Sequence, residues 1–219
     1  MSPFWLSLKL AFWTTLILVP IGLLIGRLLA YKKFNGKSWV EALVYLPLVL
    51  PPTVLGYYLL VSLSPNNAFG AALASLLGTP LVFSFPALVL ASIIVNLPFA
   101  VQPAQQAFAA IPQDTREAAW VSGLSTWQTF LRIELPQCWL GILCAATLTF
   151  AHTLGEFGVV LMVGGNIAGE TRTLSIAIYD RVQAFDMQSA GIMTAGLLIF
   201  SIAALVIVRI AGMNSHRER

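Results

Sequence analysis

The sequence predicts an all-α polytopic membrane protein with five transmembrane helices, its N-terminus outside and its C-terminus in the cytoplasm. Composition is the first observation: 58% of the 219 residues are hydrophobic and 10% are charged, whereas soluble domains carry roughly 25% charged residues. The second is a set of apolar segments that each reach the ~20 residues needed to cross a bilayer. The third is an uneven division of Lys and Arg between the two sides. With so few polar residues to cover a surface, lipid must be the main solvent.

The same composition excludes several other classes. The net charge of +3 is small and scattered, which argues against a nucleic-acid partner. Cys138 and Cys144 are too few for a disulfide framework and are expected to pack in the interior. The two histidines, His152 and His216, lie far apart in sequence, so no metal-ligand cluster is predicted.

Hydropathy divides the chain into apolar spans with polar connections. The predicted spans are 8–30, 39–63, 84–108, 138–163 and 190–211. The first is too long for the apolar core of a signal peptide and lacks a small-residue cleavage site, so we expect it to be retained. Segment 66–83 is interrupted by proline, glycine and asparagine, which predicts a re-entrant or interfacial loop in place of a sixth span.

Orientation follows from the positive-inside rule. One side of the predicted topology collects nine cationic residues: Arg27, Lys32, Lys33, Lys37, Arg116, Arg132, Arg209, Arg217 and Arg219. The other side collects three: Lys9, Arg172 and Arg181. The side with nine is therefore predicted to be cytoplasmic, and it includes the polar connection 111–136.

The connection 111–136 contains residues that typically start and end helices, in positions that predict two short helices. Asp114 and Glu117 have the spacing of a capping box, and Gly123 can adopt the left-handed conformation that ends a helix. Ser125 with Gln128 predicts a second capping box, and the second helix is expected to end before Pro136.

Two interpretations of this helix pair are open from the residues alone. Ala118 and Ala119 would leave a smooth face, flanked by the apolar side chains of Trp120, Trp127, Phe130 and Leu131. Such a pair could rest in the lipid headgroups, or it could dock into a groove on a cytoplasmic partner.

The spacing of the fixed residues favours the second interpretation. The segment contains Glu117-Ala118-Ala119, three residues, Gly123, nine residues, Ile133, one residue, and Leu135-Pro136. This pattern resembles the cytoplasmic loop of ABC-transporter permease subunits at every defined position. The resemblance implies a type I ABC importer permease fold, a single transmembrane domain over 1–219, and a coupling helix seated in a cleft of a separate ATPase.

The chain itself is not expected to hydrolyse ATP. Gly36-Lys37-Ser38 is similar to the end of a phosphate-binding loop, but Tyr31 stands where the motif requires glycine. No cofactor is therefore expected on this chain, and the resemblance implies that ATP and Mg²⁺ are bound by the partner ATPase.

A translocation pathway is predicted near the helix breaks. Pro47, Pro51 and Pro52 fall within six residues, which predicts a broken second span. Breaks in lipid persist only where protein or a water-lined cavity satisfies the backbone. Asn96 in the third span could line this pathway or serve as a hydrogen bond between helices.

The end of the fourth span adds further candidates for the pathway or its gate: Gly155, Glu156 and Phe157. A carboxylate within a span usually faces protein or water. For Glu156 a structural role, holding neighbouring backbone amides, is favoured because a carboxylate would repel an anion. His152 is expected to be a packed, hydrogen-bonded residue.

An external loop with a surface helix is predicted over 164–188. Apolar residues at 174, 176, 178 and 182 have the spacing of a helix face. This helix could anchor in the interface, or the loop could dock an external binding protein through Glu170, Thr171 and Arg172.

Three segments are similar to the molybdate/tungstate branch of these permeases. They are Pro51 to Leu60, Leu154 to Gly158, and Gly165 to Thr173. Sulfate permeases are close relatives, so a sulfate, thiosulfate or other oxyanion remains an alternative cargo. The resemblance implies a multi-pass protein of the bacterial cytoplasmic membrane that forms a homodimer with two ATPase subunits and an external molybdate-binding protein. A passive channel and a membrane enzyme remain more remote alternatives.

Overall fold

Every regular element in the described part of the chain is helical. The computed structural model describes residues 1–78 and 80–217, with side chains described outside 77 and 207–217. The elements are α1 (Pro3–Tyr31), α2 (Lys37–Val49), α3 (Pro52–Leu63), α4 (Ala68–Leu77), α5 (Phe85–Ala109), α6 (Gln113–Val121), α7 (Thr126–Thr129), the π-helix η1 (Phe130–Glu134), α8 (Leu135–Gln137), α9 (Trp139–Gly155), α10 (Gly158–Gly164), α11 (Leu174–Gln183) and α12 (Met187–Arg217). The predicted all-α class is confirmed for these residues.

The core forms where α1, α5 and α9 pack against one another. Glycines let α1 approach α5 closely: a Cβ on Gly22 would lie 2.7 Å from the Cβ of Ala100. A Cβ on Gly26 would lie 2.8 Å from the backbone nitrogen of Gln105. These contacts leave no space for a side chain at either glycine, so the backbones of α1 and α5 pack directly against each other.

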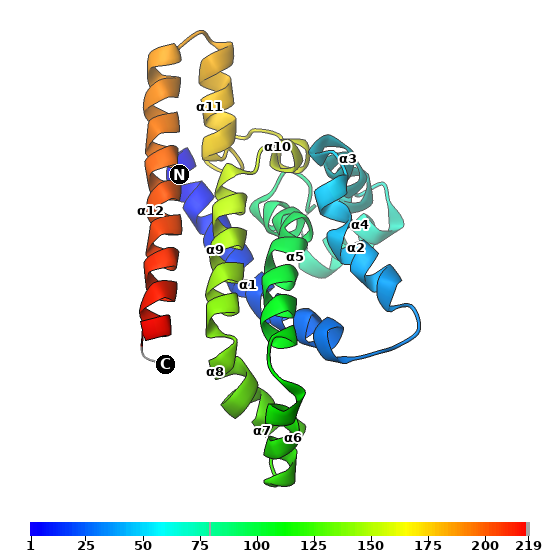
Figure 1. Ribbon diagram of the computed structural model, residues 1–219. Coiled ribbons are helices and arrows are strands. Elements are labelled where there is room, and N and C mark those ends of the chain that lie inside the picture. The colour runs from blue at the N-terminus through cyan, green and yellow to red at the C-terminus, as the bar shows by residue number, and fades with distance from the viewer. Residues whose placement is uncertain (79, 218–219) are drawn as a thin grey trace.

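Within the described part of the chain, three helices are each long and apolar enough to cross a bilayer: α1, α5 and residues 187–206 of α12. Two pairs of helices qualify only when each bent pair is counted as one span, which gives up to five. The N-terminus lies nearer the end that carries the hairpin of α11 and α12, and the C-terminal end of α12 lies nearer the opposite end (Figure 1). Only 6% of the α12 window is buried, so most of this helix is available to lipid or to another chain.

The proline run breaks the second span, as predicted. α2 ends at Val49 and α3 begins at Pro52, and their axes differ by 111°. Because Pro51 and Pro52 have no N–H to donate, the helical hydrogen-bond ladder cannot continue through them. By contrast, α5 runs through Pro98 and Pro103 without interruption.

The predicted single span 138–163 is wrong, because the helix stops inside it. α9 ends at Gly155, Glu156 is extended, and α10 starts at Gly158. A Cβ on Gly158 would lie 2.9 Å from the Cβ of Pro52. The chain therefore leaves the direction of α9 in order to pack α10 against α3.

The segment 66–83 contains one short helix, α4, of 10 residues. At 1.5 Å per residue it is about 15 Å long, half of the ~30 Å hydrocarbon thickness. Asn67 caps it by accepting a hydrogen bond from the backbone N–H of Phe69 at 3.0 Å. This agrees with the prediction that the segment is not a sixth span.

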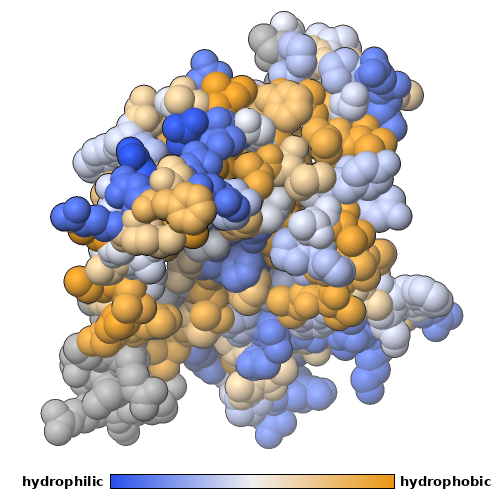
Figure 2. All heavy atoms as spheres, turned by 90° about the horizontal axis from the view of Figure 1, so that it is seen from above, coloured by the Kyte–Doolittle hydropathy of each residue, from blue (hydrophilic) through white to orange (hydrophobic). Residues whose placement is uncertain are grey.

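The two ends of the molecule differ in character. α6 and α7 project from one end, and the hairpin of α11 and α12 stands out at the other (Figure 1). Figure 2 looks onto the second end and shows hydrophilic residues gathered on part of it, with hydrophobic residues along the sides. Arg27 and Arg116 both pair with Glu134, and Lys9 and Glu170 line one hollow. The division of the cationic residues between the two sides of a membrane stays a prediction.

Substituting Gly26→Ala tests the close approach of α1 and α5. The new Cβ would meet the α5 backbone, which cannot move aside alone, so overpacking should cost about 1–3 kcal/mol. Gly191→Ala in α12 is the matched control, because a Cβ there meets nothing within 4 Å. Thermal unfolding in detergent should show a lower midpoint for Gly26→Ala only; equal midpoints would contradict the tight packing.

Candidate functional site

The segment 111–136 folds into two short helices joined by a sharp turn. Gly123 has a φ of 83° and follows the end of α6. The backbone N–H of Leu124 donates to the carbonyl of Ala119 at 3.1 Å, which closes the helix end. Ser125 and Gln128 form the predicted capping box at the start of α7. These two predictions are confirmed.

The capping box predicted for Asp114 and Glu117 is wrong. α6 begins at Gln113, after Pro112, so Asp114 already lies in the first turn and cannot cap it. The Glu117 carboxylate instead accepts a hydrogen bond from Nε2 of Gln113 at 2.6 Å. Proline favours the start of a helix, and here it moves the start upstream.

The helix was also expected to end before Pro136, and it continues through this residue. The π-helix η1 precedes Pro136, and the backbone N–H of Leu135 donates to the carbonyl of Phe130. The wider π turn gives the proline ring room that an α turn lacks. The helix axis bends by 73° only after Gln137, where α9 begins.

The surface of this segment differs in part from the prediction. Glu117 and Ala118 are exposed, but Ala119 is only 7% exposed, so the two alanines do not share one face. Phe130 is buried beside Phe108. The apolar side chains that are exposed are Trp120, Val121, Trp127 and Leu131.

Ile133, Leu135 and Pro136 lie where the segment joins the body of the molecule. Leu135 packs against the cluster that contains Phe108 and Phe130. Ile133 is half-buried, and Pro136 is exposed. Of these three residues, Leu135 therefore anchors the segment, whereas Glu117 and Ala118 lie on its free surface.

A hollow of about 640 Å³ lies where α3, α9 and α10 meet. Its lining consists of Pro52, Thr53, Ala151, His152, Gly155, Glu156, Phe157 and Gly158. Four of the predicted pathway residues are thus brought together: Pro52, Gly155, Glu156 and Phe157. Pro51 precedes the first turn of α3 directly.

Asn96 does not line this hollow but supports a residue that does. Its side chain is fully buried on α5, donates to the carbonyl of Ser92 at 2.8 Å, and lies 3.0 Å from Nδ1 of His152. The His152 ring stacks on Phe99 at 4.2 Å between centroids. His152 is therefore hydrogen-bonded, as predicted, but it also faces the hollow, which sequence reasoning missed.

Glu156 has the structural role that the sequence favoured. Its carboxylate is 7% exposed and accepts a hydrogen bond from the backbone N–H of Val159 at 3.3 Å, within the first turn of α10. The Ser175 hydroxyl donates to the Glu156 backbone carbonyl. Glu156 therefore ties the end of α9 to both α10 and α11.

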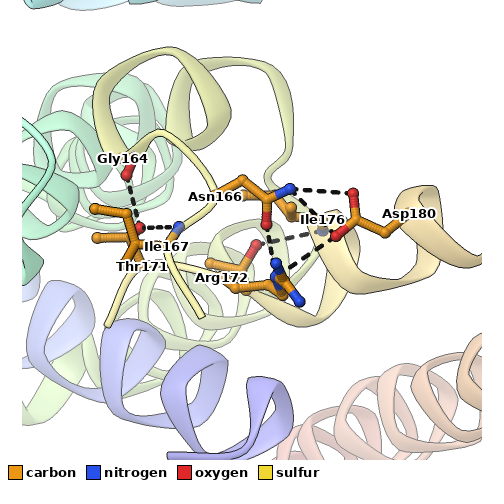
Figure 3. Close-up of polar contacts among 8 residues, drawn as sticks. Gly164, Asn166, Ile167, Thr171, Arg172, Ile176 and Asp180 are labelled. Atoms are coloured by element: carbon orange, nitrogen blue, oxygen red, sulfur yellow. Dashed lines mark hydrogen bonds and ion pairs between the residues drawn. The ribbon is translucent and has the colours of Figure 1, made fainter. Parts of the chain in front are cut away.

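The loop after α10 is held by its own side chains (Figure 3). The Thr171 hydroxyl donates to the carbonyl of Gly164 at 2.6 Å and accepts from the backbone N–H of Ile167 at 2.9 Å. The Arg172 guanidinium donates to Asn166 at 2.7 Å and lies 3.5 Å from the Asp180 carboxylate. The loop is thus fixed to α11.

This geometry corrects one predicted docking residue. Thr171 is fully buried, so its side chain cannot contact a binding protein. Glu170 is exposed, and the Arg172 side chain is 36% exposed while paired with Asp180. Of the three residues predicted to dock a binding protein, Glu170 and Arg172 have accessible side chains, and the docking role stays a prediction for these two.

The turn from α11 to α12 provides a further exposed feature. Phe185 is 86% exposed and has a φ of 57°, a conformation that bulky residues rarely adopt. Beside it, hydrogen bonds from Ser189 lower the pKa of Asp186 below its ordinary value, and Arg181 lies 3.1 Å away. Asp186 caps the start of α12, where negative charge is favourable.

A family model described as "Binding-protein-dependent transport system inner membrane component" matches residues 19–219. The chain belongs to this family.

Several curated proteins are similar to the chain over most of its length. It is 45% identical over 201 residues to the "Molybdenum transport system permease protein ModB" of Azotobacter vinelandii, covering 91% of this chain and 88% of that protein. The Escherichia coli K12 protein of the same name is 36% identical, with 92% and 87% covered. A "Probable sulfate transport system permease protein cysT" of Chlorella vulgaris is 30% identical, with 94% and 77% covered.

Solved structures share the fold. A bacterial ABC transporter involved in alginate import aligns with a TM-score of 0.74 at 23% identity, covering 98% of this chain and 78% of that one. The MetNI methionine ABC transporter aligns with a TM-score of 0.68 at 21% identity, covering 94% and 93%. The chain therefore has the fold of ABC importer permeases and is a multi-pass membrane protein.

Substituting Thr171→Val tests the loop architecture. Two hydrogen bonds are lost and a buried carbonyl and N–H are left without this partner, which should cost about 1–3 kcal/mol. The Ile167 amide should then exchange its hydrogen faster. Glu170→Gln, one residue away on the exposed surface, serves as the control and should leave this exchange rate unchanged. Unchanged exchange in Thr171→Val would contradict the assigned contacts.

Proposed function

We propose that the chain is the permease subunit of an ATP-driven importer that moves molybdate or tungstate across the bacterial cytoplasmic membrane. The observation that carries this proposal is the 45% identity to a molybdenum transport permease over 91% of the chain. Sulfate permeases from three plant and algal sources reach 30–32%. Sulfate or thiosulfate is accordingly the second candidate cargo.

In this proposal the chain has no ATP-hydrolysing site and holds no cofactor. ATP and Mg²⁺ bind to two cytoplasmic ATPase subunits. The motion of these subunits is transmitted to the segment from α6 to α8. The exposed Glu117 and Ala118, with Trp120, Val121 and Trp127 beside them, offer a surface for a cleft on the ATPase. Gly123 gives that surface its turn, and Ile133, Leu135 and Pro136 join it to the body of the molecule.

We place the pathway at the hollow between α3, α9 and α10, completed by a second copy of the chain in a homodimer. The hollow is lined by helix ends, and backbone amides there can meet an oxyanion without a cation that would trap it. Pro51, Pro52, Gly155, Glu156 and Phe157 shape it, while Asn96 orients His152. The N-terminal end then faces outward, where Glu170, Arg172 and Phe185 are available to a molybdate-binding protein.

Substrate choice is tested by reconstituting the permease with its ATPase and binding protein in lipid vesicles. ATP turnover should rise with molybdate or tungstate in the binding protein and not with sulfate. Stimulation by sulfate alone would favour the second cargo. Oxyanion uptake that persists without the ATPase would instead indicate a channel.

The coupling role is tested by Gly123→Val, which forces a branched residue into the left-handed region at about 1–2 kcal/mol. The altered turn should abolish import while membrane insertion persists. Gly36→Val is the matched control, because Gly36 has a φ of 91° and equally open surroundings. Import that survives in Gly123→Val, or is lost equally in both variants, would contradict a specific coupling role for the turn.

A further inference from the structure

A fully buried carboxylate lies inside the π-helix η1. Glu134 is 0% exposed and accepts hydrogen bonds from Nε and Nη2 of Arg27, the second at 3.1 Å. Nε of Arg116 lies 3.5 Å from Oε1, the same oxygen that accepts from Nη2 of Arg27. Arg27 belongs to the last turns of α1, Arg116 to α6, and Glu134 to η1, so one carboxylate joins three segments.

Aromatic rings enclose the two cations. The Arg116 guanidinium lies 3.5 Å from the ring centre of Tyr31 and 5.2 Å from that of Trp120. The Arg27 guanidinium lies 5.2 Å from the ring centre of Phe130. Cation–π contacts of this kind strengthen where water is excluded. Contacts with aromatic rings therefore hold the two guanidinium groups in addition to their ion pairs with Glu134.

Stability alone does not account for this cluster. Removing a carboxylate from water costs several kcal/mol, and well-packed apolar residues often serve a fold equally well or better. What the charges add is a fixed geometry, because a forked guanidinium and a carboxylate match in one arrangement. The cluster fixes where α6 lies relative to α1.

Two covalent routes lead from α6 to the membrane helices. Upstream, residues 110–112 join it to α5. Downstream, the chain passes through the left-handed turn at Gly123, the short α7 and the π turn before the 73° bend into α9. Neither route leads directly to α1. The ionic contact does, and α1 in turn packs on α5 at Gly22 and Gly26.

We propose that Glu134 is a positioning residue that joins α6 to α1 as one rigid unit, so that motion imposed on α6 moves α1 and α5 together. This rests on the proposed function, since it assumes that an ATPase moves α6. Glu134 touches no substrate; it acts through Arg116 and Arg27.

Arg116→Gln is the decisive variant, because it releases α6 while leaving the Arg27–Glu134 pair intact. The matched control is Lys33→Gln, which removes one positive charge from an exposed position just after α1 and outside α6 to α8. Wild-type and variant permeases are reconstituted with ATPase and binding protein, and the ATP hydrolysed per ion imported is measured. We expect this ratio to rise about tenfold in Arg116→Gln, within the roughly 5–150-fold range that corresponds to typical coupling free energies, and to stay unchanged in Lys33→Gln.

Several outcomes would overturn the proposal. An unchanged ratio in Arg116→Gln with a lowered unfolding midpoint would make the cluster purely structural. Loss of ATPase binding by this variant, judged by copurification, would place Arg116 in the docking surface. If the wild-type complex itself imports nothing, the proposed function fails, and that result is separate from the comparison of variants.

A distance measurement tests rigidity without transport. Spin labels at Asp114, which is exposed in the first turn of α6, and at exposed Lys32, which closes α1, report the position of α6 relative to α1. Cys138 and Cys144 are replaced by Ala in this background. We expect one narrow distance in the complex with and without ATP, and a broad distribution in Arg116→Gln. A narrow distribution that the variant leaves unchanged would refute the rigid unit.

Discussion

The structure depends on one constraint: polar groups exposed by a broken helix must find partners within the protein, because lipid supplies none. Three irregular segments of this chain carry a polar side chain that ties them to neighbouring parts of the protein. Glu156 accepts from the first turn of α10 where α9 stops, and Thr171 closes the loop after α10. Glu134 lies in the π turn and forms ion pairs with Arg27 and Arg116. Removing any of these would leave buried groups unpaired, which costs more than the hydrogen bond itself contributes.

This constraint also separates a rigid centre from the irregular segments around it. The centre is the contact of α1 with α5, where glycines bring backbones together and little can shift. The broken helices lie around it and form the hollow at one side and the projecting α6–α8 segment at one end (Figure 1). Under the proposed function, irregular backbone lies at the proposed pathway and at the proposed contact with the ATPase, and continuous helices form the rigid centre.

The sequence predicted features that depend on a few neighbouring residues. The turn at Gly123, the Ser125–Gln128 box and the break at the prolines were all foreseeable, because φ restrictions and side-chain reach act locally. The start of α6 at Gln113 was missed although its cause, Pro112, is local. Other predictions failed where packing between distant segments decides the structure. The predicted span over 138–163 is divided because α10 packs on α3. Phe130 was predicted to lie on the apolar surface of the helix pair, but it is buried because it packs beside Phe108 of α5.

By itself the sequence determined the membrane class, the segment 117–136 and the resemblance to ABC permeases, since composition and short-range spacing carry that information directly. Only the tertiary structure decided which polar residues work together. Arg27 and Glu134 are 107 positions apart, and Asn96 and His152 are 56 apart. No local rule pairs residues at such separations. They meet because α1, α5 and α9 pack side by side, and a buried charge or amide must be satisfied by whatever group the neighbouring helix presents.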